Sequence, residues 1–88
     1  MHSNLLKDKV ALITGGAGGI GFAVASAYCQ NGASVVLTDF NENKLLEAKK
    51  KLQGPVLPLA LDVTDEDQTQ SVLDCAIEKY GKIDIVVP

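Results

Sequence analysis

A cluster of glycines near the N-terminus constrains the fold of this 88-residue chain more than any other feature. Five glycines fall in the run TGGAGGIG, over residues 14–21. The apolar run Val10–Thr14 before them is typical of a buried strand, and Ile20–Gln30 after them has apolar residues at helical spacing. Glycines in this position let the backbone turn tightly and let a phosphate approach a helix N-terminus. The cluster therefore predicts a strand–loop–helix unit suited to binding phosphate groups.

The rest of the chain alternates between strands and helices. We predict further strands over Ser34–Thr38, Val56–Leu61 and Ile83–Val87, with amphipathic helices between them. The order β-α-β-α-β-α-β predicts an α/β, Rossmann-like, doubly wound parallel sheet with strand order 3-2-1-4. Pro58 lies in the third strand, and a proline cannot donate to a ladder, so that strand should form an edge. The 3-2-1-4 order places it there.

The apolar spacing and the polar residues at helix starts predict finer details. Asn41 is a predicted N-cap of the second helix, and Thr64, with Asp67 three residues on, of the third. The predicted buried faces are Ile20, Ala23, Val24, Ala27 and Tyr28; then Leu45, Leu46, Ala48, Lys49 and Leu52; then Val72, Leu73, Ala76, Ile77 and Tyr80. Glycines Gly32 and Gly81 are predicted to end the first and third helices.

An acidic residue follows the second predicted strand. Asp39 can accept hydrogen bonds from the adenine ribose hydroxyls of NAD, and it would repel the additional phosphate of NADP. Phe40 beside it carries no positive charge, the chain has no arginine, and Lys44 is interpreted as a solvated helix residue. These residues predict NAD rather than NADP as the cofactor.

Other interpretations of the glycine loop and the acid remain open. The glycines could form a turn without a ligand, and Asp39 could serve as a helix cap. A methyltransferase also combines a glycine-rich loop with an acid after the second strand. A P-loop is excluded, because no Gly-Lys-Ser/Thr follows the glycines.

Four ordered motifs resemble the short-chain dehydrogenases/reductases, in their compact single-domain branch. Residues 9–21 resemble the family's first strand and its TGxxxGIG loop, which favours that register over the generic GxGxxG of Gly16, Gly18 and Gly21. Asp39 is the second motif, Asp62-Val63 resembles the pair after the third strand, and residues 80–87 resemble the approach to the fourth. The resemblance covers residues 7–87.

The resemblance implies a role for seven residues in cofactor binding. The pyrophosphate would lie against Gly15, Gly19, Ile20 and Gly21, the adenine ribose against Asp39, and the adenine against Asp62 and Val63. For Asp62 the alternative is a cap of the third helix. Thr14 is interpreted as a structural residue at the strand end. The family also implies hydride transfer between NAD(H) and a small alcohol or carbonyl substrate, and a homo-oligomeric parent protein.

The sequence departs from the family after the fourth strand. Pro88 stands where relatives have the first residue of an Asn-Asn-Ala-Gly turn, and neither Tyr28 nor Tyr80 is followed by a lysine four residues on. The single histidine, His2, is expected to lie in a frayed N-terminal tail. We therefore expect no catalytic residue in the chain and no turnover by the chain alone.

We therefore expect residues 1–88 to be the N-terminal, dinucleotide-binding portion of a longer oxidoreductase. The alternative is a genuine short product, for instance of alternative splicing, acting as a non-catalytic nucleotide-binding or interaction module. The fourth strand would have an unpaired apolar edge, so we expect the chain by itself to self-associate.

Composition narrows the remaining classes. The formal net charge is −3 with dispersed charges, which argues against nucleic acid and against an anionic membrane surface as partners. The charge-free stretch 10–38 could span a bilayer by length, but its glycines favour a buried strand–helix–strand unit. Cys29 and Cys75 are far apart and without nearby ligands, so we expect no metal site and two thiols in a reducing compartment such as the cytoplasm. Residues 1–4 do not resemble a signal peptide.

Overall fold

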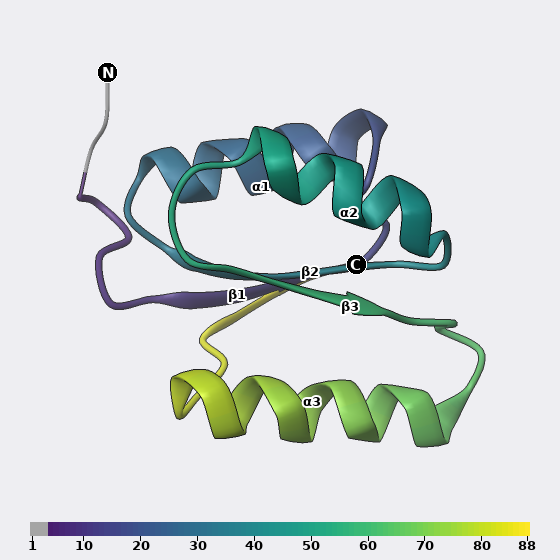
Figure 1. Ribbon diagram of the computed structural model, residues 1–88. Helices are drawn as coiled ribbons and strands as arrows, with labels where there is room; N and C mark the ends of the chain where they lie inside the picture. Colours follow the sequence, from purple (N-terminus) through teal and green to yellow (C-terminus); the bar gives the residue numbers. More distant parts are fainter. Residues whose placement is uncertain (1–3) are drawn as a thin grey trace.

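The computed structural model describes residues 4–88 as a parallel sheet with helices on both faces (Figure 1). The strands are β1 (Val10–Ile13), β2 (Ser34–Asp39), β3 (Val56–Ala60) and β4 (Ile85–Val87), and the helices are α1 (Gly19–Gln30), α2 (Glu42–Lys51) and α3 (Glu66–Tyr80). The predicted order of elements is confirmed. The third strand ends one residue before the predicted boundary, and the fourth begins two residues after it. His2 lies outside the described residues.

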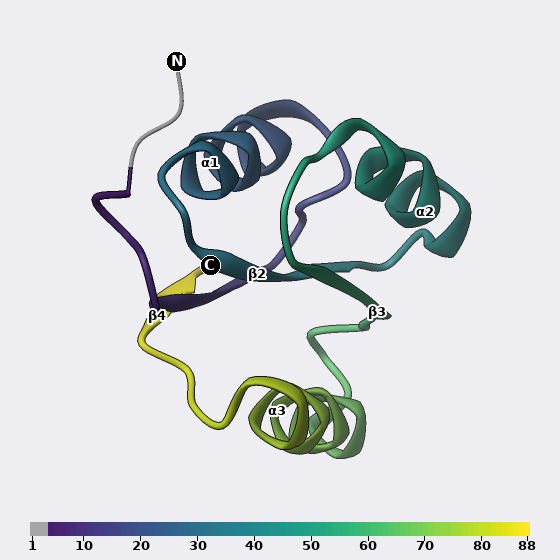
Figure 2. The ribbon, with the colours of Figure 1, turned by 60° about the vertical axis from the view of Figure 1, so that its left-hand side comes forward.

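The strand order β3-β2-β1-β4, with every pairing parallel, confirms the predicted topology. Within the described residues β3 pairs only with β2, so Pro58 lies on an edge strand as predicted, opposite Leu37. The helices α1 and α2 cover one face of the sheet and α3 covers the other, as Figure 2 shows. Because all pairings are parallel, each crossover returns the chain to the end of the sheet at which the next strand begins.

Two apolar clusters fill the layers on either side of the sheet. The cluster under α3 contains Val10, Leu12, Val36, Leu61, Val72 and Ala76. The cluster under α1 and α2 contains Ile13, Ala25, Val35, Leu37, Leu45 and Ala48. Because alternate residues of β1 and β2 enter opposite clusters, both strands are buried on both faces, which explains their unbroken apolar sequence.

The buried face of α1 differs from the predicted one. Ala25 is its fully buried residue, and Val24, Tyr28 and Cys29 pack beside it. Ile20 is 85% exposed, and Ala23 and Ala27 are exposed as well, so three of the five predicted positions were wrong. The helix has two apolar stripes, and only the one containing Ala25 lies over β1 and β2.

The predicted buried faces of α2 and α3 are confirmed for the residues at the centre of each face and are wrong for some residues at its margins. Buried residues are Leu45 and Ala48 in α2 and Val72 and Ala76 in α3. Lys49 is exposed, and Leu46 and Ile77 are 45% and 49% exposed. Leu73 and Tyr80 pack against the cluster under α3, and Leu52 against the other, as predicted.

The ends of the helices depend on single residues. The Asn41 side chain accepts a hydrogen bond from Lys44 N at 3.0 Å, which confirms this N-cap. At α3 the N-cap is Asp65, which accepts from Gln68 N at 3.1 Å; the predicted cap, Thr64, was wrong by one residue. Gly81 ends α3 with a φ of 83°, in the left-handed conformation that glycine adopts without strain.

Asp84 joins the beginnings of β1 and β4. Its backbone N–H donates to Val10 O at 2.8 Å, and its Oδ2 accepts from Val10 N at 2.8 Å. The latter bond and Lys82, 3.2 Å away, lower the pKa of Asp84. The side chain thus takes the place of a ladder bond, and β4 begins after it. Within residues 4–88 no helix is long and apolar enough to cross a membrane.

Candidate functional site

The carboxyl ends of the strands meet at one edge of the sheet, where a cleft of about 380 Å³ opens. Pairing of Ile13 with both Leu37 and Val87 aligns the ends of β1, β2 and β4, and Asp39 pairs with Ala60 of β3. The cleft is lined by Thr14, Gly15, Thr38, Asp39, Phe40, Leu61, Asp62, Val63 and Pro88. In doubly wound folds this is the edge at which ligands bind.

The glycine-rich loop needs glycine at particular positions. Gly15 and Gly19 have φ angles of 63° and 57°, which side chains other than glycine adopt at a cost. At Gly21 an added Cβ would overlap the carbonyl oxygen of Gly15. Gly18 has an extended backbone, and an added Cβ would meet open space there. The geometry thus requires glycine at the positions of the TGxxxGxG register, whereas the generic register includes the unconstrained Gly18.

The first turn of α1 differs from those of the other two helices. Its N-cap is Gly18, which has no side chain to accept from the first-turn N–H groups, whereas Asn41 and Asp65 cap α2 and α3. Uncapped N–H groups and the positive end of the helix dipole favour an anion at this point. The loop therefore brings a helix end that suits an anion beside the cleft.

Asp39 lies between the loop and the cleft. Its Oδ2 accepts a hydrogen bond from Ala17 N in the glycine-rich loop at 3.0 Å, and its Oδ1 accepts from Asn41 N at 3.0 Å. A carboxylate has about four lone-pair positions, so these two bonds leave two for a ligand. Asp39 can therefore accept from a diol in the cleft while it stays bound to the backbone.

Asp62 stabilises the turn that follows β3. Its Oδ1 accepts from Thr64 N at 2.9 Å and from Thr64 Oγ1 at 2.6 Å, and these bonds lower its pKa. The N-cap of α3 is Asp65, so the alternative role of Asp62 as that cap is wrong. Asp62 thus holds a turn on the wall of the cleft and stays charged there.

Four of the seven predicted site residues meet at the cleft, and three lie beside it. Gly15, Asp39, Asp62 and Val63 line its wall, and residues 19–21 form the first turn of α1. Thr14 donates from N and Oγ1 to Val87 O, at 3.0 and 3.3 Å, so this residue, predicted to be structural, joins the end of β1 to β4.

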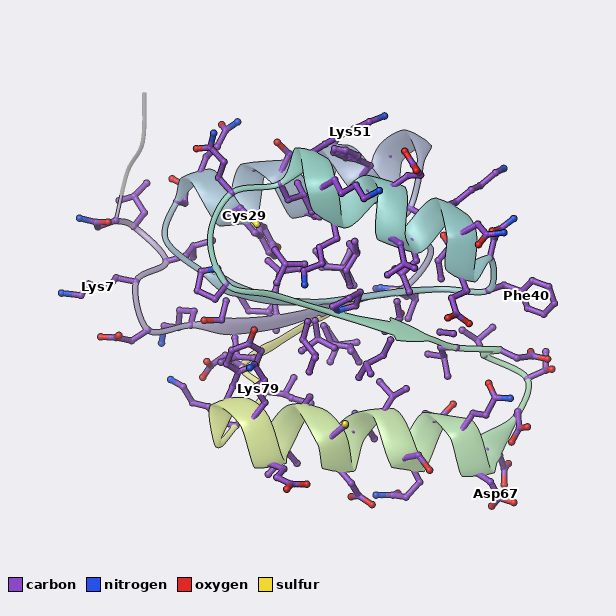
Figure 3. All side chains as sticks on the ribbon, in the orientation of Figure 1. Lys7, Cys29, Phe40, Lys51, Asp67 and Lys79 are labelled. Carbon is purple, nitrogen blue, oxygen red and sulfur yellow. The ribbon has the colours of Figure 1, made fainter. Side chains whose placement is uncertain are left out.

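Sequence reasoning missed the apolar contribution of Phe40 to the cleft. This ring is 78% exposed, and Val63 is 67% exposed. Figure 3 shows Phe40 beyond the end of the sheet, pointing away from the core. The signal that was available is position: Phe40 directly follows the acid at the end of β2. Exposed apolar surface at a cleft mouth suits a flat ring of a ligand.

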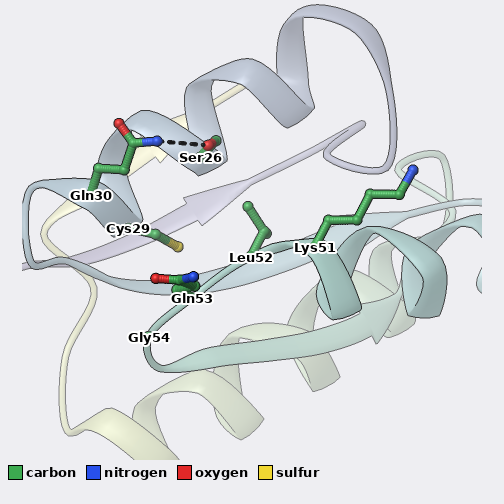
Figure 4. A pocket seen from close by; sticks show the side chains of 7 residues that line it. All are labelled: Ser26, Cys29, Gln30, Lys51, Leu52, Gln53 and Gly54. Carbon is green, nitrogen blue, oxygen red and sulfur yellow. Dashed lines mark hydrogen bonds between the residues drawn. The ribbon is translucent and has the colours of Figure 1, made fainter. Parts of the chain in front are cut away.

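A cavity larger than this cleft lies at the opposite edge of the sheet (Figure 4). It measures about 480 Å³ and lies where α1 and α2 end, beside Cys29, Lys51 and Gly54. Burial raises the pKa of the Cys29 thiol, which disfavours the thiolate. The size of this cavity does not make it the functional site, because the glycine-rich loop and both acids lie at the other edge.

The profile of the short chain dehydrogenases matches residues 9–88. The chain belongs to the short-chain dehydrogenase family. This identification confirms the resemblance found in the sequence motifs. The family consists of oxidoreductases that use nicotinamide cofactors and small substrates, on the α/β fold found here.

Relatives within the short-chain dehydrogenases are about three times as long as the chain. A 12alpha-hydroxysteroid dehydrogenase from Clostridium sp. is 45% identical, over 94% of this chain and 36% of its own length. A 3-oxoacyl-[acyl-carrier-protein] reductase from Thermotoga maritima is 42% identical, over 93% and 35%. The chain thus spans about a third of the length of these relatives.

Solved structures of short-chain dehydrogenases superpose on the chain. A short chain dehydrogenase from Mycobacterium smegmatis gives a TM-score of 0.90 at 34% identity, covering 98% of this chain and 38% of the other. A 3-ketoacyl-(acyl-carrier-protein) reductase from Brucella melitensis, solved with NADH, gives 0.88 at 32% identity, covering 92% and 33%. The sheet and helices described above therefore have the same arrangement as the corresponding third of these enzymes.

Proposed function

We propose that residues 1–88 form the NAD(H)-binding, N-terminal portion of a short-chain dehydrogenase that oxidises an alcohol or reduces a carbonyl compound. The observation that carries the proposal is the position of Asp39, which lies between the uncapped start of α1 and the cleft and is bonded to the glycine-rich loop. In dinucleotide-binding folds the pyrophosphate lies at the helix start, and the ribose attached to it lies at the acid after the second strand. The relative from Brucella melitensis was solved with NADH, which supports a nicotinamide cofactor as the ligand.

The proposed site has a distinct part for each group of the cofactor. The pyrophosphate lies against the glycine loop at Gly15 and against the first turn of α1, residues 19–21. The adenine ribose bonds to Asp39, and the adenine lies between the Asp62-Val63 wall and the ring of Phe40. Nicotinamide supplies the hydride acceptor or donor when the cofactor is bound. The residues of this chain bind and orient the cofactor and move no proton.

The proposed preference is for NAD over NADP. The carboxylate of Asp39 would repel a phosphate on the adenine ribose, and the sequence has no arginine to pair with one. Lys44 belongs to α2 and is exposed, and its backbone N–H is bonded to Asn41. The side chain at the proposed ribose position is therefore negatively charged, which favours the ribose diol of NAD over the ribose phosphate of NADP.

The chemical step is assigned to parts of the enzyme that the 88 residues do not contain. No Tyr-x-x-x-Lys occurs in the sequence, so the proton transfer that accompanies hydride transfer has no donor here. We expect no turnover from this chain alone. We also place the protein in a reducing compartment, for which the two free thiols, one of them exposed, are the support.

Titration calorimetry on the 88-residue chain tests the proposal. NAD should bind at least about tenfold more tightly than NADP, since a charge-assisted hydrogen bond is worth about 1.5–3 kcal/mol. Asp39→Ala should weaken NAD binding by about tenfold or more. Asp74→Ala removes the same charge from the exposed face of α3 and serves as the matched control. NAD binding that is indifferent to Asp39→Ala, or equal affinities for both cofactors, would refute the proposed role of Asp39.

A further inference from the structure

The glycine-rich loop is fastened to the end of β2 at consecutive residues. Gly16 N donates to Thr38 O at 2.8 Å, and Ala17 N donates to Asp39 Oδ2 at 3.0 Å. Thr38 in turn donates from Oγ1 to Ile13 O at 2.8 Å. Of these three bonds, the one to Asp39 is accepted by an ionisable side chain at the surface of the cleft. It is therefore the one that can be changed without altering the core.

The Asp39 carboxylate is held in orientation by a second bond. Its Oδ1 accepts from Asn41 N, two residues on, which is the geometry of an Asx turn. With one oxygen fixed locally, the other points to Ala17 in the loop. A hydrogen bond from an amide to a carboxylate is about twice as strong as one between neutral groups. The side chain thus links two backbone segments, the glycine-rich loop and the N-cap of α2.

We infer that Asp39 is a positioning residue for the glycine-rich loop, which it holds in its phosphate-binding conformation before any cofactor arrives. The inference rests on the proposed function and adds to it, since the ribose contact alone would need no bond to Ala17. A loop held in advance loses less conformational freedom on binding, so the pyrophosphate is bound more tightly. Asp39 therefore acts on two parts of the cofactor, one directly and one through the loop.

Asp39→Asn separates the two actions. An amide has one acceptor oxygen, which the local bond to Asn41 N retains, and its NH₂ group then faces the Ala17 N–H. The bond to the loop is lost while the shape of the side chain is kept. Asp62→Asn is the matched control: it also removes one charge from the cleft wall, but Asp62 bonds to Thr64 and not to the loop.

Amide hydrogen exchange followed by NMR, without cofactor, tests the bond to the loop. In Asp39→Asn the exchange rate of the Ala17 amide should rise at least about tenfold, because a hydrogen bond worth about 1.5–3 kcal/mol is lost. The amides of β1 and β2 should keep their rates, and Asp62→Asn should leave Ala17 unchanged. An unchanged Ala17 rate overturns the inference. So does an equal rise across the sheet, because Asp39 would then support the whole fold rather than the loop.

Inorganic pyrophosphate, which has no ribose, tests the consequence for binding. Removing a negative charge beside an anion site should strengthen binding by charge alone, as expected for Asp62→Asn. Asp39→Asn should nevertheless weaken pyrophosphate binding by about threefold or more, because the loop is no longer held. Equal or tighter binding by Asp39→Asn overturns the inference. If the unaltered chain binds neither pyrophosphate nor NAD, the proposed function fails, and the exchange rates still decide whether Asp39 holds the loop.

Discussion

The α-carbon of Gly21, in the first turn of α1, faces the carbonyl of Gly15 so closely that a methyl group would overlap its oxygen. The loop therefore passes directly beside the first turn of the helix. We expect Gly21→Ala to push the two segments apart and to weaken NAD binding at least about tenfold, in line with the effect of a misplaced binding group. Calorimetric titration with NAD measures the change. Thermal unfolding followed by circular dichroism reports whether the fold survives.

Gly18→Ala is the matched control for the loop. It adds the same methyl group three residues before Gly21, at a backbone that is extended and in open space. Alanine has no side-chain oxygen, so the first-turn N–H groups of α1 stay free for the ligand. NAD affinity should stay within about twofold of the unaltered chain, because no contact is displaced. A Gly18→Ala protein that loses binding as severely as Gly21→Ala would contradict this account of the loop.

The fold could be predicted because its decisive signals are local. The strands β1 and β2 are apolar on both faces, so their sequence shows that helices cover both sides of the sheet. Pro58 adds an independent constraint, since it excludes a central position for β3. Strand order then followed from right-handed crossovers and from the position of that edge.

The errors arose where the sequence offers two equally regular choices. In α1 the stripe containing Ile20 and the stripe containing Ala25 both have helical spacing, and packing against the sheet decides between them. At α3 two adjacent residues can cap, and in the structure the Thr64 hydroxyl bonds to Asp62 while the Asp65 carboxylate accepts from Gln68 N. Such choices depend on partners distant in sequence or on the geometry of one turn.

The site was predictable in its residue types and less so in its bonds. The glycine spacing and the acid after β2 located the cleft, because parallel strands end at the same edge. The bond from Ala17 to Asp39 had no signal in the sequence, since any acid at that position satisfies the motif. Such a bond depends on the loop's path, which positive φ angles at Gly15 and Gly19 determine.

The outer edge of β4 should make the 88-residue chain self-associate. Within the described residues β4 pairs with β1 on one side only, and Val86 on it is 59% exposed. Exposed apolar edge strands pair with other chains, and lysine on an edge prevents this. We expect Val86→Lys to reduce the mean mass measured by light scattering, while Leu46→Lys, on an exposed position of α2, should not. A monodisperse monomer of the unaltered chain would contradict this expectation.

The link between Asp84 and Val10 should make stability depend on pH. Because the folded pKa of Asp84 is lowered, its charge stabilises the fold above the pKa of the unfolded chain, about 3.9. That stabilisation is lost as the pH falls through the folded value. We expect Asp84→Asn to melt at a lower temperature than the unaltered chain at pH 7, with the gap closing as the pH falls from about 3.9 through the folded pKa. Asp62 titrates alike in both proteins, so a gap of equal size at pH 7 and at acidic pH would show that the Asp84 charge contributes nothing.

The turn before β1 holds Asp8 at a φ of 66°, in the left-handed region. Glycine adopts this conformation freely and a β-branched residue does so only under strain. We expect Asp8→Gly to be at least as stable as the unaltered chain, and Asp8→Val to be less stable than Asp8→Gly by about 1–2 kcal/mol. Thermal unfolding should show that gap as roughly 4–16 °C for a chain of this length. Asp74→Gly, the same change inside α3, should instead destabilise, because glycine disfavours a helix interior. If Asp8→Val and Asp8→Gly melt together, the turn does not need the left-handed conformation.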